Sequence, residues 1–271
     1  LDVTQRLGAN TIGSATVNTD FAETEVDARR TNLTRFSLVF PEKRTFFLEG
    51  ASTFDFGLGT GDDVRPFFSR TLGLLGGREV PVTAGVKVNG QEGRTYFGAL
   101  AVRTGDVDTL PTANTMGVIR LRQNILRESS VGMIATLGDP LARANAHTAG
   151  ADFTYQTSQF QGDKNLLVGA WGLETAHDGL RGDRTAVGAM IDYPNDRWDI
   201  AASYRRMGDG FKPSLGFVPR PGVQAMSLNV NFQARPRMPI GPFRVRTMLH
   251  EFQSSVVSRL DGVWESYRVF T

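Results

Sequence analysis

The chain has 271 residues, and its 30 Lys and Arg nearly balance its 28 Asp and Glu, leaving a formal net charge of +2 at pH 7. Because nucleic-acid-binding domains carry a clustered basic face, this balance argues against a nucleic-acid partner. The sequence contains no cysteine, which excludes disulfide bonds, thiol catalysis and cysteine-based metal centres.

The first of two expected regions, residues 1–78, holds one or more initial strands and then an irregular part without clean alternation. Its stretch 36–50 mixes both signs of charge with phenylalanine and leucine. Two interpretations stay open for this stretch. It could fold into the interior of a barrel as a plug or constriction, or it could be a loop with a small aromatic core of its own. The charged candidates are Glu42, Lys43, Arg44 and Glu49.

In the second region, residues 79–271, apolar and polar residues alternate with a period of two. The pattern is clear at 82–88, 115–123 and 226–233, and it recurs in about a dozen segments of about 9–11 residues, joined by turns or polar loops. No run approaches 18 apolar residues, so a transmembrane helix is not expected. The spacing predicts an all-β, antiparallel fold.

A soluble β-sandwich and a membrane β-barrel both produce this alternation. Sandwich strands are typically shorter, about 5–6 residues. Aromatic residues near the strand ends are typical of the girdles of a barrel in lipid; here they are Tyr155, Tyr193, Trp198, Tyr204, Phe232 and Phe243. We therefore expect an antiparallel transmembrane β-barrel, present here only in part because the chain lacks an initiator Met and stops inside a strand-like run.

Arginines recur at the polar positions of the predicted strands, where we expect them to face the lumen. They would either raise the local concentration of anions or form ion pairs that stiffen the barrel. The lumen-facing candidates are Arg103, Arg120, Arg122, Arg205, Arg244, Arg246 and His250. Neither HExxH nor GxSxG occurs, so we predict no metal site, no cofactor and no catalytic residue.

Four blocks, NTDFAETEVD at 18–27, NLTRFSLVFPEKRTFFLEG at 32–50, PFFSR at 66–70 and GFKPSLGFVPR at 210–220, together resemble one family of bacterial outer-membrane proteins. In that family a carbohydrate-binding family 9-like domain precedes a carboxy-terminal domain of unknown function of the DUF5916 type. Thr45 departs from the family pattern, in which Pro is expected. The resemblance implies a location in the bacterial outer membrane and a β-barrel, and its companion domain implies a glycan-linked role. Family members are longer, so we expect this chain to be a piece of a longer protein.

The expected function is that of a non-enzymatic outer-membrane β-barrel used for passage or surface anchoring. One alternative is a structural subunit of a larger envelope complex, with a filled barrel. Another is a membrane-associated hydrolase using His250 near Ser254 and Ser255. The expected partners are outer-membrane lipid and, depending on the alternative, other envelope proteins or an oligosaccharide.

Overall fold

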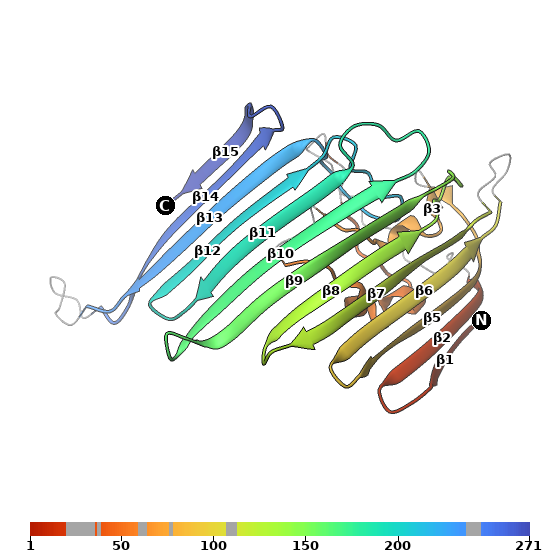
Figure 1. The fold of residues 1–271 in the computed structure, drawn as a ribbon, viewed down its shortest axis with the longest axis horizontal. Helices are drawn as coiled ribbons and strands as arrows, with labels where there is room; N and C mark the ends of the chain where they lie inside the picture. Colours follow the sequence, from red (N-terminus) through yellow and green to blue (C-terminus); the bar gives the residue numbers. More distant parts are fainter. Residues whose placement is uncertain (20–35, 37–38, 59–63, 76–77, 107–112, 237–244) are drawn as a thin grey trace.

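The computed structural model describes residues 1–19, 36, 39–58, 64–75, 78–106, 113–236 and 245–271. Its main feature is one antiparallel sheet of 13 strands, ordered β1-β2-β5-β6 and onward to β15 (Figure 1). β1 and β15 form the two edges, so the sheet stays open. The prediction of an all-β, antiparallel fold is confirmed, but closure into a barrel is absent from the described chain.

Most strands of the sheet are long. β1 (Asp2–Arg6) and β15 (Trp264–Phe270) are the shortest, and the others run from 9 to 14 residues. Those others are β2 (Thr11–Thr19), β5 (Val82–Glu92), β6 (Thr95–Thr104), β7 (Thr115–Ile125), β8 (Ser129–Leu137), β9 (His147–Phe160), β10 (Lys164–Ala176), β11 (Thr185–Pro194), β12 (Trp198–Met207), β13 (Val223–Ala234) and β14 (Met248–Arg259). Strands of about 9–11 residues are long enough to cross the hydrocarbon of a bilayer when tilted.

Between β2 and β5 the chain leaves the sheet. It forms a short helix α1 (Thr45–Leu48), 3-10 turns η1 (Ala51–Phe54) and η2 (Ser69–Thr71), and a small hairpin of β3 (Leu74–Leu75) and β4 (Arg78–Glu79). We call residues 39–58 and 64–75 the covering segment. It lies behind the strands in Figure 1, so it packs on one face of the sheet, here called the covered face. The opposite face is called the outer face.

The hydrophobic core lies between the covering segment and the sheet. Phe46, Phe47, Phe54 and Phe56 of the segment are buried there. Aromatic side chains bury the largest apolar areas, so these four supply much of the contact. The sheet side of the same cluster consists of Val82, Leu100, Val102, Met116, Val118, Ile134, Trp171, Leu173, Ala186, Met207 and Val223.

A long connection between β12 and β13, residues 208–222, completes this core. Phe211 and Leu215 are fully buried in it. The connection also extends the segment by backbone hydrogen bonds, because the amide of Phe68 donates to Leu215 O at 2.7 Å and the amide of Phe217 donates to Arg65 O at 2.8 Å. The block GFKPSLGFVPR and the block PFFSR are therefore neighbours in space.

The connections differ between the two ends of the sheet. At one end lie 105–114, 138–146, 177–184 and 208–222, together with the covering segment. We call this the long-connection end. At the other end the turns 93–94, 126–128, 161–163 and 195–197 are short, and the connection between β13 and β14, residues 235–247, is longer. Left-handed backbone at Gly93 (φ 56°) and Gly162 (φ 101°) allows two of these tight turns. In the described part of the chain, no helix is both long and apolar enough to span a membrane.

Candidate functional site

A buried ion pair joins the sheet to the covering segment. Arg120 of β7 and Asp152 of β9 meet in two parallel hydrogen bonds, Nη1 to Oδ1 at 2.5 Å and Nη2 to Oδ2 at 2.9 Å. Their side chains are only 3% and 8% exposed. The Nε of Arg120 donates to the backbone oxygen of Asp55 at 3.0 Å, and its guanidinium lies 5.2 Å from the ring centre of Phe56. One arginine thus binds two strands and the segment.

Gly132 of β8 provides the space for this ion pair. It is paired with Asp152 on β9 and with Arg122 on β7. A Cβ at this position would lie 2.6 Å from Nη1 of Arg120 and 2.8 Å from Oδ1 of Asp152. Any side chain at residue 132 would therefore push the two charged groups apart.

Lys87 of β5 makes the second contact between sheet and segment. Its ammonium donates to the backbone oxygens of Phe46 and Glu49, the latter at 2.5 Å. These carbonyls lie at the end of α1, where backbone oxygens have no partner within the helix. Lys87 was missed in the sequence analysis, although it is the one charged residue at a polar position of 82–88.

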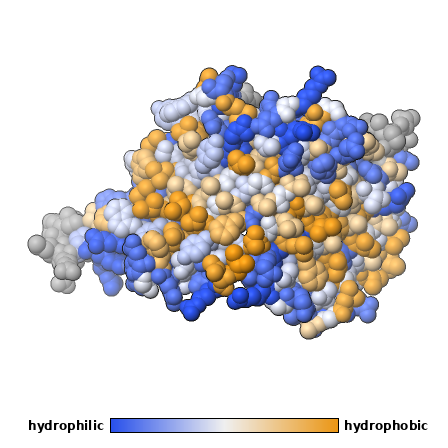
Figure 2. All heavy atoms as spheres, viewed as in Figure 1, coloured by the Kyte–Doolittle hydropathy of each residue, from blue (hydrophilic) through white to orange (hydrophobic). Residues whose placement is uncertain are grey.

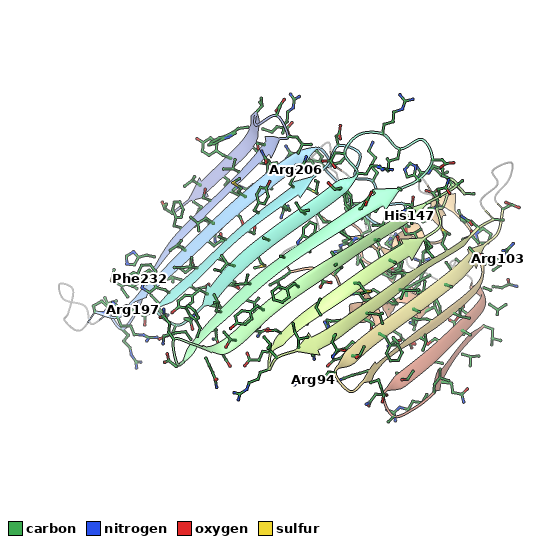
Figure 3. The ribbon with its side chains drawn as sticks, viewed as in Figure 1. Arg94, Arg103, His147, Arg197, Arg206 and Phe232 are labelled. Atoms are coloured by element: carbon green, nitrogen blue, oxygen red, sulfur yellow. The ribbon has the colours of Figure 1, made fainter. Side chains whose placement is uncertain are left out.

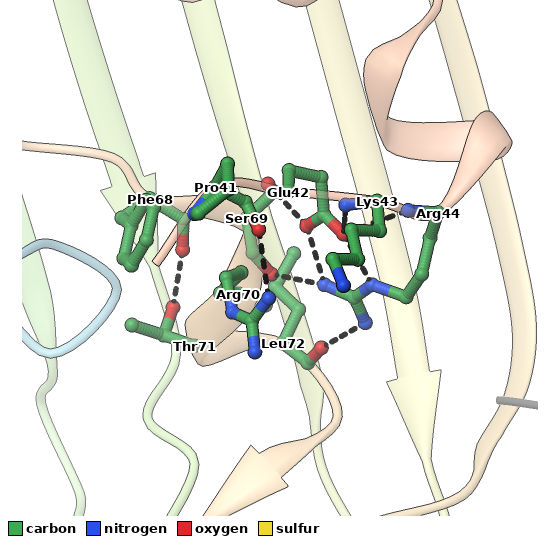
Figure 4. A network of polar contacts seen from close by, with 9 residues as sticks. All are labelled: Pro41, Glu42, Lys43, Arg44, Phe68, Ser69, Arg70, Thr71 and Leu72. Atoms are coloured by element: carbon green, nitrogen blue, oxygen red, sulfur yellow. Dashed lines mark hydrogen bonds and ion pairs between the residues drawn. The ribbon is translucent and has the colours of Figure 1, made fainter. Parts of the chain in front are cut away.

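Two of the predicted plug charges, Glu42 and Arg44, pair with each other (Figure 4). Arg44 binds both carboxylate oxygens of Glu42 at 2.7 Å, and Ser69 donates to Glu42 Oε2 at 2.6 Å. Arg44 also donates to the backbone oxygens of Leu72 and Ser69. Burial by itself would raise the pKa of Glu42, but the hydrogen bonds and charge of Arg44, with Ser69, lower it below its ordinary value.

The remaining plug candidates take smaller parts. The backbone amide of Lys43 donates to Glu42 Oε1 at 3.0 Å, and Glu49 accepts a bond from Thr4 at 3.3 Å through its carboxylate. The segment thus has a polar and aromatic core of its own and also covers the sheet. The aromatic core agrees with the loop interpretation, whereas the plug interpretation requires a barrel interior and stays a prediction.

A second buried carboxylate, Asp139, ties the long connections together. Its side chain is fully buried and accepts hydrogen bonds from Arg143 Nε at 2.8 Å and Ser214 Oγ at 2.6 Å. Arg143 in turn lies 3.1 Å from Nε2 of His177, and the side-chain amide of Asn114 donates to Asp139 O at 2.9 Å. Asn114, Arg143 and Ser214, from three connections, therefore meet at Asp139, and His177 of a fourth connection joins them through Arg143.

The structure divides the predicted lumen-facing residues between the two faces. Arg120, Arg122 and Arg205 point to the covered face, and the guanidinium of Arg122 lies 4.6 Å from the ring centre of Tyr96. Arg103 is exposed on the outer face because it alternates with buried Val102 and Thr104. The expectation of one shared face therefore does not hold for Arg103.

His250 also lies on the outer face. It is paired with Phe232, and the two rings stack with their centres 6.0 Å apart. The sequence analysis placed His250 on the polar face with Arg246, whereas the pairing of β14 with β13 places it on the outer face, and Arg246 precedes the strand. Arg246 is exposed in a bend before β14, and Arg244 lies outside the described residues.

The described part of the chain contains no group of three or more His, Cys, Asp or Glu placed to hold a metal ion. The hydrolase alternative rests on His250 and the serines at 254 and 255. Ser254 shares the outer face with His250 but stands four residues along the strand, about 13 Å away. Ser255 points to the opposite face. Neither hydroxyl is within hydrogen-bond reach of the imidazole, as a nucleophile and its base must be.

The outer face is apolar although nothing in the described chain covers it. Figure 2 shows apolar side chains in broad patches across its middle. Figure 3 shows polar residues at the strand ends, with Arg103, His147 and Arg206 at one end and Arg94 and Arg197 at the other. Met133 and Val86, near the middle of their strands, are 59% and 58% exposed. The exposed apolar residues of this face include Val86, Ile119, Leu121, Val131, Met133, Leu137, Phe153, Val187, Ile191, Met226 and Leu228.

One family model, described as "Domain of unknown function (DUF5916)", matches residues 10–75 of the chain. This stretch contains β2 and the covering segment, so the match falls on the element that fills the covered face. It supports the family resemblance drawn from the FPEKR and FFLEG blocks. The search of curated proteins and the search of solved structures each found no match.

The geometry around Gly132 predicts that Gly132→Ala destabilises the protein. The added methyl group must displace Arg120 or Asp152, and overpacking of this kind typically costs about 1–3 kcal/mol. Gly172→Ala on β10 is the matched control, because the nearest heavy atom to its Cβ would be Val187 Cγ1 at 3.9 Å. The denaturant midpoint of each folded variant in detergent measures the effect. Equal midpoints for the two variants would contradict the role given to Gly132.

The buried carboxylates predict acid sensitivity at the long-connection end. Burial would raise the pKa of Asp139, but hydrogen bonds from Arg143, Ser214 and the Leu141 amide lower it below the ordinary 3.8. A carboxyl with a lowered pKa in the folded state stabilises the fold above its ordinary pKa, and this contribution is lost as pH falls through the lower value.

We therefore expect the thermal unfolding midpoint to fall as the pH drops from about 5 to below 3.8. Asp139→Asn should lower the free energy of unfolding at pH 7 by about 1–3 kcal/mol, because it disrupts a buried, hydrogen-bonded charge, and should reduce the change of the midpoint with acid. Asp178→Asn, in the neighbouring connection and outside this carboxylate's hydrogen bonds, is the control and should keep the wild-type profile. An Asp139→Asn variant with an unchanged profile would show that another group sets the acid response.

Proposed function

We propose that this chain forms the wall and the internal filling of a non-enzymatic outer-membrane β-barrel of a bacterium. In this proposal the outer face contacts lipid hydrocarbon, and the covered face looks into the barrel. The covering segment acts as a plug that occupies part of the interior. The long-connection end faces the outside of the cell, since bacterial barrels carry short turns on the periplasmic side.

The observation that carries this proposal is the distribution of apolar side chains over the two faces. A water-soluble sheet buries its apolar face beneath another layer. Here the single covering layer lies on the face that also holds Lys87, Arg120 and Asp152, while the apolar outer face is bare in the described chain. Soluble monomers rarely expose an apolar patch larger than a few hundred Å². Lipid is the environment that suits such a face.

Passage is supported by the covered face of β11–β14, which is more polar than that of β5–β8. Ser203 and Ser227 share a hydrogen bond at 2.7 Å, and Asn231 donates to Asp199 at 3.3 Å. Asp192, Asn229, Glu251 and Gln253 stand on the same face. We call residues 192, 199, 203, 227, 229, 231, 251 and 253 the polar strip. Hydroxyl, amide and carboxylate groups suit hydrated neutral or cationic solutes, among which an oligosaccharide is one class.

A second candidate function, a structural subunit with a filled barrel, is favoured by one specific observation. The segment is held by three charged residues with buried side chains, Lys87, Arg120 and Asp152, and by the connection 208–222. A plug fixed so firmly would leave the barrel closed. The two candidate functions, passage and a closed structural barrel, therefore differ in whether ions pass along the polar strip.

Single-cysteine variants test the lipid contact, because these 271 residues contain no cysteine. Ile119→Cys and Met226→Cys, on the outer face, should resist a charged, water-soluble maleimide in native membranes and react with a lipid-soluble one. Asn229→Cys, on the polar strip, should show the reverse if water enters the barrel. Labelling is measured by the mass increase of the purified protein.

The control for these variants is the same labelling in denaturant, where every thiol should react equally with both reagents. In native membranes, rapid reaction of the charged maleimide with the Ile119→Cys and Met226→Cys variants would overturn the proposed contact with lipid. It would point instead to an interface with water or with a polar partner.

Conductance across planar bilayers tests passage. The full-length protein should give discrete steps with a preference for cations, because the polar strip carries Asp192, Asp199 and Glu251. Asp199→Asn should reduce that preference about twofold or more, as judged from the reversal potential in a salt gradient. Asp163→Asn, in an exposed turn outside the strip, is the control. An absence of steps would favour the filled, structural barrel.

A further inference from the structure

A groove on the outer face runs over β5–β8. Its volume is about 480 Å³. Alanine and glycine form the floor, at Ala99 and Ala101 of β6, Gly117 of β7 and Ala135 of β8. Val86 of β5 and Leu137 of β8 stand at the two sides. The groove is thus lined mainly by carbon atoms on a face already exposed.

The depth of the groove follows from the register of the strands. Val86 pairs with Ala101, Ala101 with Gly117, and Gly117 with Leu137. In this row across four strands, two large side chains therefore flank two small residues. At Gly117 a Cβ would lie 2.7 Å from the backbone oxygen of Leu100. Glycine at this position keeps the floor of the groove low.

A cationic residue stands at the end of this floor. Arg103 follows Ala99 and Ala101 at every second position of β6, so it shares their face, and it pairs with Thr115. Its Nη1 donates to Thr115 Oγ1 at 3.3 Å. On the other side of the groove, His147 is paired with Leu137 and is exposed. Figure 3 shows Arg103 and His147 at the same end of the sheet, the long-connection end.

We propose that this groove binds an anionic lipid, with one acyl chain on the Ala99, Ala101 and Gly117 floor and its phosphate at Arg103. The inference rests on the proposed function, because only a face in lipid meets acyl chains. The apolar groove matches the acyl chain of such a lipid, and the guanidinium at its end matches the phosphate. Arginine binds phosphate through charge-assisted hydrogen bonds, and the Thr115 hydroxyl holds the guanidinium at the groove end.

Native mass spectrometry of the full-length protein in a neutral detergent tests this inference. The probes are phosphatidylglycerol and phosphatidylcholine with identical acyl chains. We expect retention of one phosphatidylglycerol, at least fivefold preferred over phosphatidylcholine. Arg103→Ala should abolish the preference, and Ala101→Phe should remove binding of both lipids by filling the groove.

Two variants serve as matched controls. Arg94→Ala removes an arginine at the opposite end of the sheet, where its side chain donates to Leu126 O. Ala170→Phe adds the same ring on the outer face of β10, away from the groove. Both should retain phosphatidylglycerol as the wild type does. Loss of binding in these controls would overturn the assignment to the groove.

The remaining outcomes also decide the matter. A lipid-free dimer that Ala101→Phe dissociates would show that a second copy of the chain occupies the groove, and the lipid proposal would fall. Equal retention of the two lipids would remove the role of Arg103. If no lipid is retained while the outer-face cysteine variants still label only from the lipid phase, this inference fails and the proposed function stands.

Discussion

The fold depends on one interaction, the coordination of the buried guanidinium of Arg120. It binds the carboxylate of Asp152 on another strand and the backbone oxygen of Asp55 in the covering segment. Removing an ion from water costs several kcal/mol, so a single missing partner would make this position unfavourable. The segment is therefore not merely an apolar layer, because its backbone completes the coordination of a charge on the sheet. Lys87 is coordinated in the same way, because its buried ammonium donates to two backbone carbonyls near the end of α1.

The need to pair buried charges accounts for the distribution of polar and apolar side chains over the two faces of the sheet. The covered face carries buried charges together with the apolar core and receives the segment, whereas the apolar side chains of the outer face are left bare in the described chain. In water a bare apolar face is unfavourable, since burial of apolar area drives folding there. In lipid an exposed apolar face carries no penalty in free energy. The buried charges of the covered face still need hydrogen-bond partners, and the segment supplies them. The architecture and the proposed environment are thus two parts of one physical argument.

The long-connection end adds a second level of organisation. Asp139, together with Arg143, gathers four connections, and one of them, 208–222, also pairs with residues 65–68 of the segment. The segment is consequently held from the sheet below and from the connections at this end. Two blocks far apart in the sequence, PFFSR and GFKPSLGFVPR, therefore act as one structural unit. Their joint presence in the sequence has a physical reason, which is backbone pairing between them and burial of Phe211 and Leu215 in a common core.

The sequence by itself determined the strands, because a period of two reports directly which backbone positions share a face. It also indicated the irregular stretch at 36–50 as the place where charges and aromatics gather. The tertiary structure alone decided what those charges contact. Glu42 pairs with Arg44 two residues away, whereas Arg120 pairs with Asp152 across two strand intervals, and no local pattern specifies such a partner. It also decided which residues pair between strands, and the pairing with Phe232 places His250 on the outer face. The sequence also could not predict whether the sheet closes into a barrel. Alternation shows which residues of a strand share a face, but it does not show which strands pair at the edges of the sheet.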